Sequence, residues 1–208
     1  MTGRWSTKPS TGLRYDSSDE VTDIKKNGQL MISVNCTAKD YREIELQEDS
    51  PRGIWELAVE VFSDRIEGRF LNVVKSLLSN GDITQNAFAI MALNCLLIET
   101  LHQFVAGEDI TGSNLYVVRP NGRIRIPPVN RATYKAFLET LFPGMPEKMA
   151  GIFYDHIRCG ILQSAQTKGQ SNLTAGVDYV VGYVSPVDIS IDVVNCTEKL
   201  FVWVDCYR

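Results

Sequence analysis

The sequence predicts a mainly α-helical fold: a helical bundle with short peripheral β-strands and hairpins. First, apolar residues recur at helical spacing over 50–80. Second, the segment 83–105 is apolar on nearly every side, which is typical of a helix enclosed by its neighbours. Third, two more helical patterns follow at 130–142 and 146–167. The 208 residues are 44% hydrophobic and 22% charged, enough to bury one core.

Composition narrows the class of protein. The formal net charge of −4 argues against a surface coated in basic residues, so any nucleic-acid contact must be a local patch. The five cysteines include no C-x-x-C pair, which favours reduced thiols, and no metal-binding, phosphate-loop or nucleophile motif is present. The chain begins without the apolar stretch of a signal peptide, and its longest apolar run, Ala87 to Ile98, is shorter than the roughly 20 residues that span a bilayer. We expect a cytoplasmic protein with no membrane association, no metal and no cofactor.

The N-terminal region divides into a tail and a short β element. Residues 1–28 are rich in Ser, Thr, Asp and Lys without a sustained period, so we expect a polar flexible tail. The main domain then spans 29–208. Within it, the apolar alternation over 29–36 and a second β-prone run at 42–46 predict two short strands.

A long helix is expected next, with Ser50 as its cap, Pro51 at its first position and Asn80-Gly81 at its end. Arg65 and Arg69 lie one turn apart on this helix, among acidic residues. Opposite charges at this spacing usually line a solvated face, and this is the reading we favour. The alternative is that the two arginines reach a phosphate and bind nucleic acid.

The enclosed helix at 83–105 carries three polar side chains near its end. Glu99 lies one turn before His102 and Gln103, close enough in sequence to share hydrogen bonds. A carboxylate beside an imidazole can take part in catalysis, although a single histidine near a helix end is more often structural.

A β-hairpin is predicted after this helix, because Asn121-Gly122 separates two β-prone runs. With these two residues as the loop, Tyr116, Arg123 and Arg125 fall on one face. A face that mixes basic and aromatic groups can contact phosphates and stack a base, but a solvated hairpin has the same composition.

The C-terminal third is expected to return from helix to mixed structure. Asn130 caps a helix that ends near Phe142, and Pro146 opens another that runs to about Thr167. We expect a loop over 172–176. Two strands at 179–184 and 189–194 are predicted next, followed by a final helix that Asn195 and Glu198 cap.

Arg158 is the most informative residue, because it lies inside an apolar helical pattern on a helix that is expected to pack. A guanidinium cannot lose its charge, so a packed position requires an anionic partner. That partner is either a phosphate, or Tyr154 or Asp155 one turn away. Five residues later stands Gln163, whose amide cannot transfer a proton at neutral pH.

The segment Arg158-Cys-Gly-Ile-Leu-Gln163, together with Leu-Ile-Glu-Thr-Leu-His-Gln-Phe at 97–104 and Asp64-Arg-Ile-Glu-Gly-Arg69, resembles the HEPN superfamily of helical domains. The resemblance covers about 50–168, and leaves 177–208 as a C-terminal β and helix extension. The family signature is an Arg, then four to six residues, then a His, and here Gln163 stands in the place of the His.

Family members with the full motif resemble metal-independent endoribonucleases that act as homodimers with one composite site. The resemblance implies that Arg158 holds the charge developing on a phosphate, and that Gln163 occupies the position of proton transfer. His156 is a possible substitute, because an offset of seven residues returns to nearly the same helical face. Asp155, Glu99 and His102 are expected to support the site.

Three functions follow from these observations. The preferred one is a catalytically weak, HEPN-like module that binds RNA, a nucleotide or a partner through a dimeric cleft around Arg158. The second is an endoribonuclease of a toxin–antitoxin or phage-defence system. The third is a non-enzymatic dimeric scaffold or regulatory subunit. The expected partners are a second copy of the chain, RNA, and a protein antitoxin or regulator. The small residues Cys159 and Gly160 favour the dimer, because they permit a second helix to approach closely.

Overall fold

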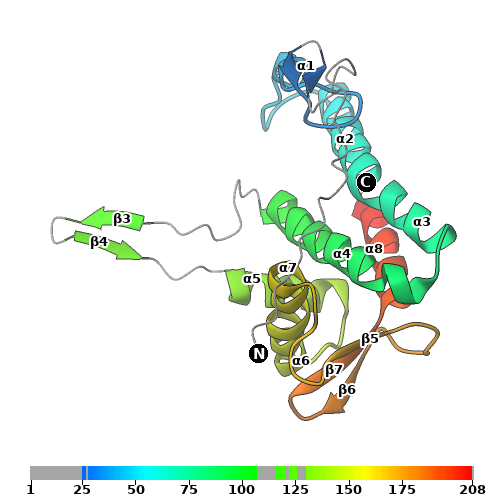
Figure 1. Cartoon of the computed structure of the whole chain (residues 1–208). Helices are drawn as coiled ribbons and strands as arrows, with labels where there is room; N and C mark the ends of the chain where they lie inside the picture. Colours follow the sequence, from blue (N-terminus) through cyan, green and yellow to red (C-terminus); the bar gives the residue numbers. More distant parts are fainter. Residues whose placement is uncertain (1–24, 27, 107–115, 120–121, 126–129, 208) are drawn as a thin grey trace, which may run out of the picture.

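The computed structural model describes residues 25–26, 28–106, 116–119, 122–125 and 130–207. Of residues 25–26, 106, 116–119, 122–125 and 130 it describes the backbone only. The fold is mainly helical, with a small three-stranded sheet at the edge of the bundle, and confirms the predicted fold class (Figure 1). The tail expected at 1–28 lies almost wholly outside the described residues.

The N-terminal β element is smaller than predicted. Strands β1 (Lys25–Lys26) and β2 (Gln29–Leu30) pair antiparallel. The strand predicted at 42–46 is wrong, because helix α1 (Ala38–Glu43) extends into its first two residues and no strand follows over 44–46. Thr37 and Asp40 form a capping box in which each side chain accepts a hydrogen bond from the other's backbone N–H. This reciprocal cap favours the helix.

The first long helix consists of α2 (Arg52–Ile66), a π-helical turn η1 (Glu67–Leu71) and α3 (Asn72–Ser79). Its N-cap is Pro51 rather than Ser50, whose hydroxyl instead accepts from the backbone N–H of Gln47. The N-terminal half of α2 extends away from the bundle (Figure 1).

Helix α4 (Ile83–Ala106) crosses the middle of the bundle, and helix α8 (Val193–Tyr207) packs against it (Figure 1). One buried polar contact fixes this pair: the Asn94 amide nitrogen donates to the Thr197 hydroxyl at 2.8 Å. The prediction that neighbouring elements enclose the apolar helix α4 holds for one side of the helix only. Phe88, Leu96 and Phe104 are exposed on the other.

Helix α4 is also long and apolar enough to cross a membrane, the single such helix in the described part of the chain. In its most apolar window, 44% of the residues are buried inside the protein. Length and composition do not distinguish a spanning helix from the core helix of a soluble protein, so the expected absence of membrane association stays a prediction.

The predicted hairpin is present as strands β3 (Tyr116–Arg119) and β4 (Gly122–Arg125). Its register pairs Arg119 with Gly122, so Gly122 is the first residue of β4. The prediction that Gly122 belongs to the loop is therefore wrong.

Helix α5 (Asn130–Leu141) is followed by a second interrupted helix. This helix consists of α6 (Glu147–Ile152), a π-helical turn η2 (Phe153–Arg158) and α7 (Cys159–Ser164). It ends three residues before the predicted Thr167, because Ala165 adopts the left-handed conformation at φ 53°.

The small sheet has the order β5-β7-β6, with β5 at Asn172–Thr174, β6 at Val181–Ser185 and β7 at Asp188–Asp192. Strand β5 pairs parallel to β7 where a loop was predicted, and β6 pairs antiparallel to it. All five residues of β7 are buried. Asp192, rather than Asn195, caps α8, because its carboxylate accepts from the Asn195 backbone N–H at 2.8 Å.

We predict that Thr197→Val lowers the free energy of unfolding by about 1–3 kcal/mol, because it leaves the fully buried Asn94 amide without its acceptor. Chemical denaturation followed by circular dichroism measures this. Thr100→Val is the matched control, since the Thr100 hydroxyl donates only to the Leu96 carbonyl of its own helix. An equal loss in both variants would contradict the role of the buried contact.

Candidate functional site

Arg158, at the end of η2, is paired with Glu99 of α4. Its Nη2 donates to Glu99 Oε2 at 2.6 Å, and both side chains are less than one-fifth exposed. Burial acts to lower the pKa of the Arg158 guanidinium, but the hydrogen bond and charge of Glu99 outweigh burial and raise the pKa above its usual value. The anionic partner that the sequence requires for Arg158 is thus a carboxylate on another helix.

The remaining part of the guanidinium is incompletely bonded. Its centre lies 5.6 Å from the Tyr154 ring, within the range of a cation–π contact. Arg158 Nε is buried and has no hydrogen-bond partner among the residues that the structure describes. Of the two local partners expected for Arg158, Tyr154 makes contact through its ring, and Asp155 binds elsewhere.

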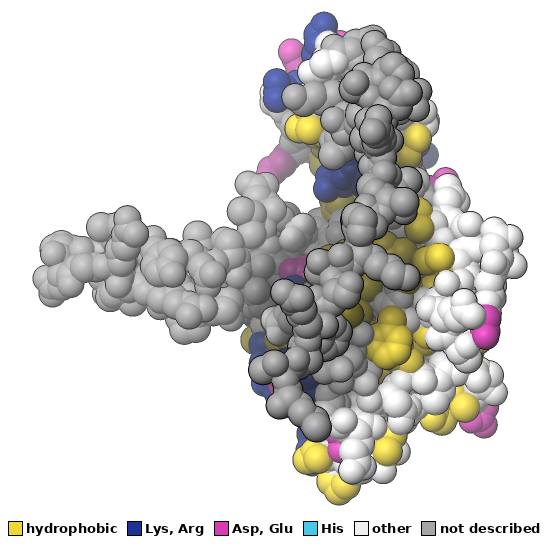
Figure 2. Space-filling model, viewed as in Figure 1, with side chains coloured by type: hydrophobic (Ala, Val, Ile, Leu, Met, Phe, Trp, Pro, Cys, Tyr) yellow, Lys and Arg dark blue, Asp and Glu magenta, His cyan; other side chains and the backbone are white. Residues whose placement is uncertain are grey.

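Asp155 accepts a bidentate pair of hydrogen bonds from Arg131 of α5, at 2.7 and 3.1 Å. This pair lines a hollow of about 350 Å³ between α5 and the α6–η2 helix, together with Lys135 and Lys148. The ideal Cβ of an alanine at Gly151 would lie 3.0 Å from Arg131 Nη2, so the glycine admits the guanidinium. Figure 2 shows basic side chains in this lower region of the molecule.

His156 is directed toward the sheet. Its Nδ1 lies 3.0 Å from the Ser171 hydroxyl and 3.5 Å from Asp188 Oδ1. Hydrogen bonds from Ser185 and from the Gln170 backbone lower the pKa of Asp188, with a further contribution from His156. This trio is not a nucleophilic triad, because serine and carboxylate meet the same ring nitrogen, and Ser171 is buried and accepts from the Ile189 N–H. Through Asp188, His156 links its own helix to strand β7.

The π-helical turn changes the expected phase of the helix. A turn closed by i→i+5 bonds rotates less per residue than an α-helix, so an offset of seven residues across it does not return to one face. His156 accordingly contacts the segment that leads into the sheet, whereas Gln163 is exposed on α7. The hypothesis that His156 acts in place of Gln163 therefore loses its geometric basis.

Gly160 serves the fold of its own chain. An ideal Cβ at this position would lie 2.5 Å from the Gln166 carbonyl oxygen and 3.3 Å from the Lys168 nitrogen. The glycine therefore allows the chain to return along α7, where the Lys168 N–H donates to the His156 carbonyl at 3.0 Å. The expectation that a helix of another copy packs against Gly160 is therefore wrong, because the chain's own segment 166–168 occupies that space.

Glu99 and His102 do not form the expected local pair. Glu99 bonds to Arg158, while the His102 ring lies edge-on to Phe137 with centroids 5.5 Å apart. His102 Nδ1 is buried without a hydrogen-bond partner. Sequence spacing within one helix could not reveal that the true partner of Glu99 lies 59 residues away.

Arg65 and Arg69 also depart from a simple solvated face. The Arg65 guanidinium lies 5.7 Å from the Phe104 ring, and its Nε is buried without a partner. Burial and the charge of Arg69 lower the pKa of Arg65. Arg69 donates to the Met31 carbonyl at 3.0 Å, and the nearby Asp64 accepts from Asn35. The possible phosphate role of the two arginines stays a prediction.

The predicted basic face of the hairpin can be placed only by its backbone. The register sets Tyr116 opposite Arg125 and puts Arg123 opposite Val118. Their side chains lie outside the described residues. In the part of the chain that is described, no group of three or more His, Cys, Asp or Glu residues could hold a metal ion.

We predict that Glu99→Gln lowers the free energy of unfolding by about 1–3 kcal/mol, between the values typical of exposed and buried ion pairs, because it leaves the Arg158 charge unbalanced. Glu147→Gln is the matched control: its pair with Lys135 has the same 2.6 Å separation, but Glu147 is 78% exposed. The control variant should unfold almost as the unmodified protein does. Equal losses in urea denaturation would contradict the importance of burial.

Comparison of the chain with protein-family models, with curated proteins and with solved structures found no match.

Proposed function

We propose that this chain is a HEPN-like helical module that binds single-stranded RNA through a dimeric cleft around Arg158. With Gln163 in place of the family's histidine, it cleaves RNA only weakly. The observation that carries the proposal is the state of Arg158. It is a permanent cation, less than one-fifth exposed, with one carboxylate partner among the described residues and a buried Nε that none of them hydrogen-bonds. A guanidinium that its protein partners satisfy only in part is suited to binding a phosphate oxygen.

The basic hollow beside this helix is a second observation that favours an anionic ligand. Arg131, Lys135 and Lys148 line it, against two carboxylates, Glu147 and Asp155. The ionised groups therefore leave one net positive charge in a protein whose formal charge is −4. A local excess of cations on an acidic protein is the arrangement expected for a confined phosphate contact.

Exposed apolar side chains support the dimer. Trp55 and Leu57 of α2 are 42% and 46% exposed, and Phe88 and Leu96 of α4 are also exposed. Figure 2 shows hydrophobic side chains gathered on one face in the region of α4 and α8. Contiguous apolar surface on a folded chain commonly marks a protein contact. The same observation favours the second candidate function, a dimeric scaffold without enzymatic activity.

The exposed position of Gln163 supports weak catalysis. Its side chain lies on the surface of α7, where it can meet a ligand or a second copy, but an amide has no ionisable proton near neutral pH. His156 is engaged by Ser171 and Asp188. The site therefore offers a charge for phosphate, while the position of the family's histidine holds an amide that cannot transfer a proton.

We predict that Arg158→Ala weakens binding of a fluorescently labelled single-stranded RNA about tenfold or more, the effect of losing one charge-assisted contact to phosphate. Fluorescence anisotropy measures the affinity. Arg158→Lys retains a charge and separates loss of binding from loss of folding.

Arg52→Ala is the control for nonspecific charge, because Arg52 is exposed on α2 and pairs only with Glu56. It should leave affinity nearly unchanged. Equal weakening by the Arg52 and Arg158 variants, or unchanged binding in a folded Arg158→Ala protein, would contradict the proposed site.

We predict that Gln163→His raises RNA cleavage about 10²- to 10⁴-fold, the range of general acid–base catalysis, since it restores an imidazole with a pKa near neutrality. Gel analysis of a defined RNA measures the rate, and light scattering measures the dimer. Gln166→His places an imidazole on a nearby exposed residue and should give no gain.

Adding Arg158→Ala should abolish the gain. If folded, dimeric Gln163→His protein cleaves no RNA, the enzymatic reading of the site is wrong, and binding alone remains. If the unmodified chain cleaves RNA and His156→Ala stops it, the assignment of Gln163 as the silencing residue is wrong.

A further inference from the structure

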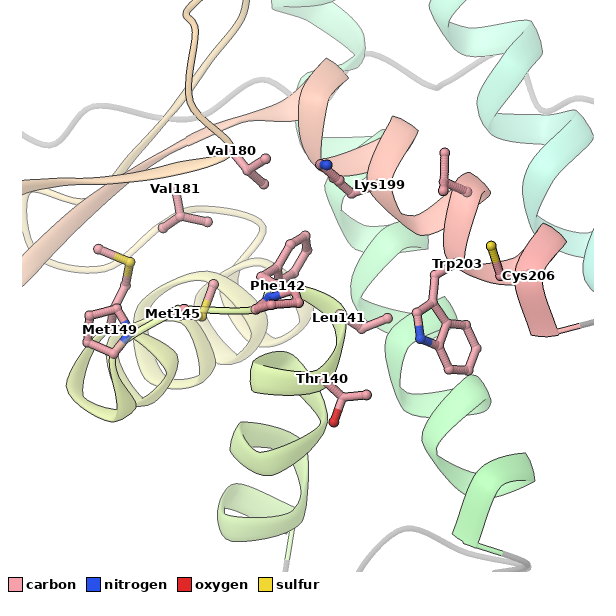
Figure 3. Close-up of a pocket in the computed structure, with 14 residues that line it drawn as sticks. Thr140, Leu141, Phe142, Met145, Met149, Val180, Val181, Lys199, Trp203 and Cys206 are labelled. Carbon is pink, nitrogen blue, oxygen red and sulfur yellow. The ribbon is translucent and has the colours of Figure 1, made fainter.

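A second cavity lies apart from the residues around Arg158. It has a volume of about 550 Å³, is open to solvent, and is lined by the connection between α5 and α6, by the start of β6 and by α8 (Figure 3). This volume lies within the range of about 300–1,000 Å³ that is usual for small-molecule sites. Three segments distant in sequence thus build one concave surface.

The lining combines apolar walls with one charge. Phe142, Met145 and Met149 come from the α5–α6 region, and Val181 comes from the sheet. Lys199 is the single charged residue among the described residues that line the cavity, which include no carboxylate. Figure 3 shows Lys199 projecting from α8 toward Val180 and Phe142.

The walls are held in place by packing within the protein. The Trp203 ring stacks on Tyr207 with centroids 5.1 Å apart, and meets Phe137 edge-on at 5.4 Å. The loop on the opposite wall contains Pro143 and Pro146, and Gly144 between them has a φ of +88° that only glycine adopts readily. A wall fixed before binding reduces the entropy that a ligand must lose.

We infer that this cavity binds a small amphipathic monocarboxylate, with its acyl chain between Met145 and Trp203 and its carboxylate at Lys199. The apolar walls match an acyl chain, because burying apolar surface is the main source of affinity. The exposed ammonium of Lys199 places the charged end at the solvent. A cationic amphiphile would meet Lys199 with no carboxylate on the lining to balance it, and a neutral one would gain no charge contact with the ammonium.

Decanoate is the probe that tests this inference, in the full-length chain. The sequence has three tryptophans, so Trp5→Phe with Trp55→Phe leaves Trp203 as the single reporter of the cavity. Decanoate should change Trp203 fluorescence saturably below about 1 mM. Decanol and decyltrimethylammonium carry the same alkyl chain with no charge or a positive charge, and should bind more weakly.

Two variants separate the charge from the cavity. Lys199→Met keeps an unbranched side chain without the charge, and should weaken decanoate binding about threefold to fivefold while leaving decanol unchanged. Val181→Phe places a larger side chain into the cavity and should weaken both probes. Lys168→Met, an exposed lysine outside the lining, is the matched control and should leave both affinities unchanged.

The exposed thiol of Cys206 gives a second readout at the edge of the cavity. Bound decanoate should slow its reaction with a thiol reagent, and Lys199→Met should shift this protection to about threefold to fivefold higher decanoate concentrations. Equal binding of all three alkyl probes would overturn the assignment of an anionic ligand. Absence of decanoate binding up to about 1 mM, as expected of a surface that docks a protein instead, would overturn the inference itself.

Discussion

A permanent charge in the interior of a helical bundle is the constraint on which this structure depends. Arg158 cannot be neutralised, so the helix that carries it must pack where a carboxylate is available. Glu99 supplies that carboxylate from α4 at 2.6 Å. The pair joins the central helix to the helix that bears the candidate site. Any function of Arg158 toward an anion therefore involves competition with Glu99 or sharing of the guanidinium, whose Nε has no partner in the described part of the chain.

The π-helical turn at Phe153–Arg158 allows neighbouring residues of one helix to serve different purposes. Asp155 turns to Arg131 of α5, His156 to Ser171 and Asp188 beside the sheet, and Arg158 to Glu99 of α4. A regular α-helix would place these side chains in a different phase. Such turns occur often at functional sites. Here the turn binds the candidate segment to three parts of the fold, and so fixes the position of Arg158.

Much of the fold was predictable because apolar periodicity decides where long helices form. The helices at 83–105 and 130–142 were predicted nearly to their bounds, and Arg158 was expected to need an anionic partner. That partner could not be identified, because an ion pair between residues 99 and 158 leaves no signal in local spacing. The π turn has no simple pattern either, so the common face assigned to His156 and Gln163 was wrong. The Thr37 and Asp40 pair is a local signal for a helix start, whereas the β-prone composition of 42–46 favours a strand, and the cap decides the outcome.

A double-mutant cycle between Glu99 and Arg158 tests the central claim most directly. Unfolding free energies of Glu99→Gln, Arg158→Met and the double variant give the coupling energy of the pair, free of effects that each side chain has alone. We predict a coupling of about 1–3 kcal/mol, with the double variant more stable than the sum of the single losses implies. A coupling below about 0.3 kcal/mol would show additive, independent residues and contradict the account.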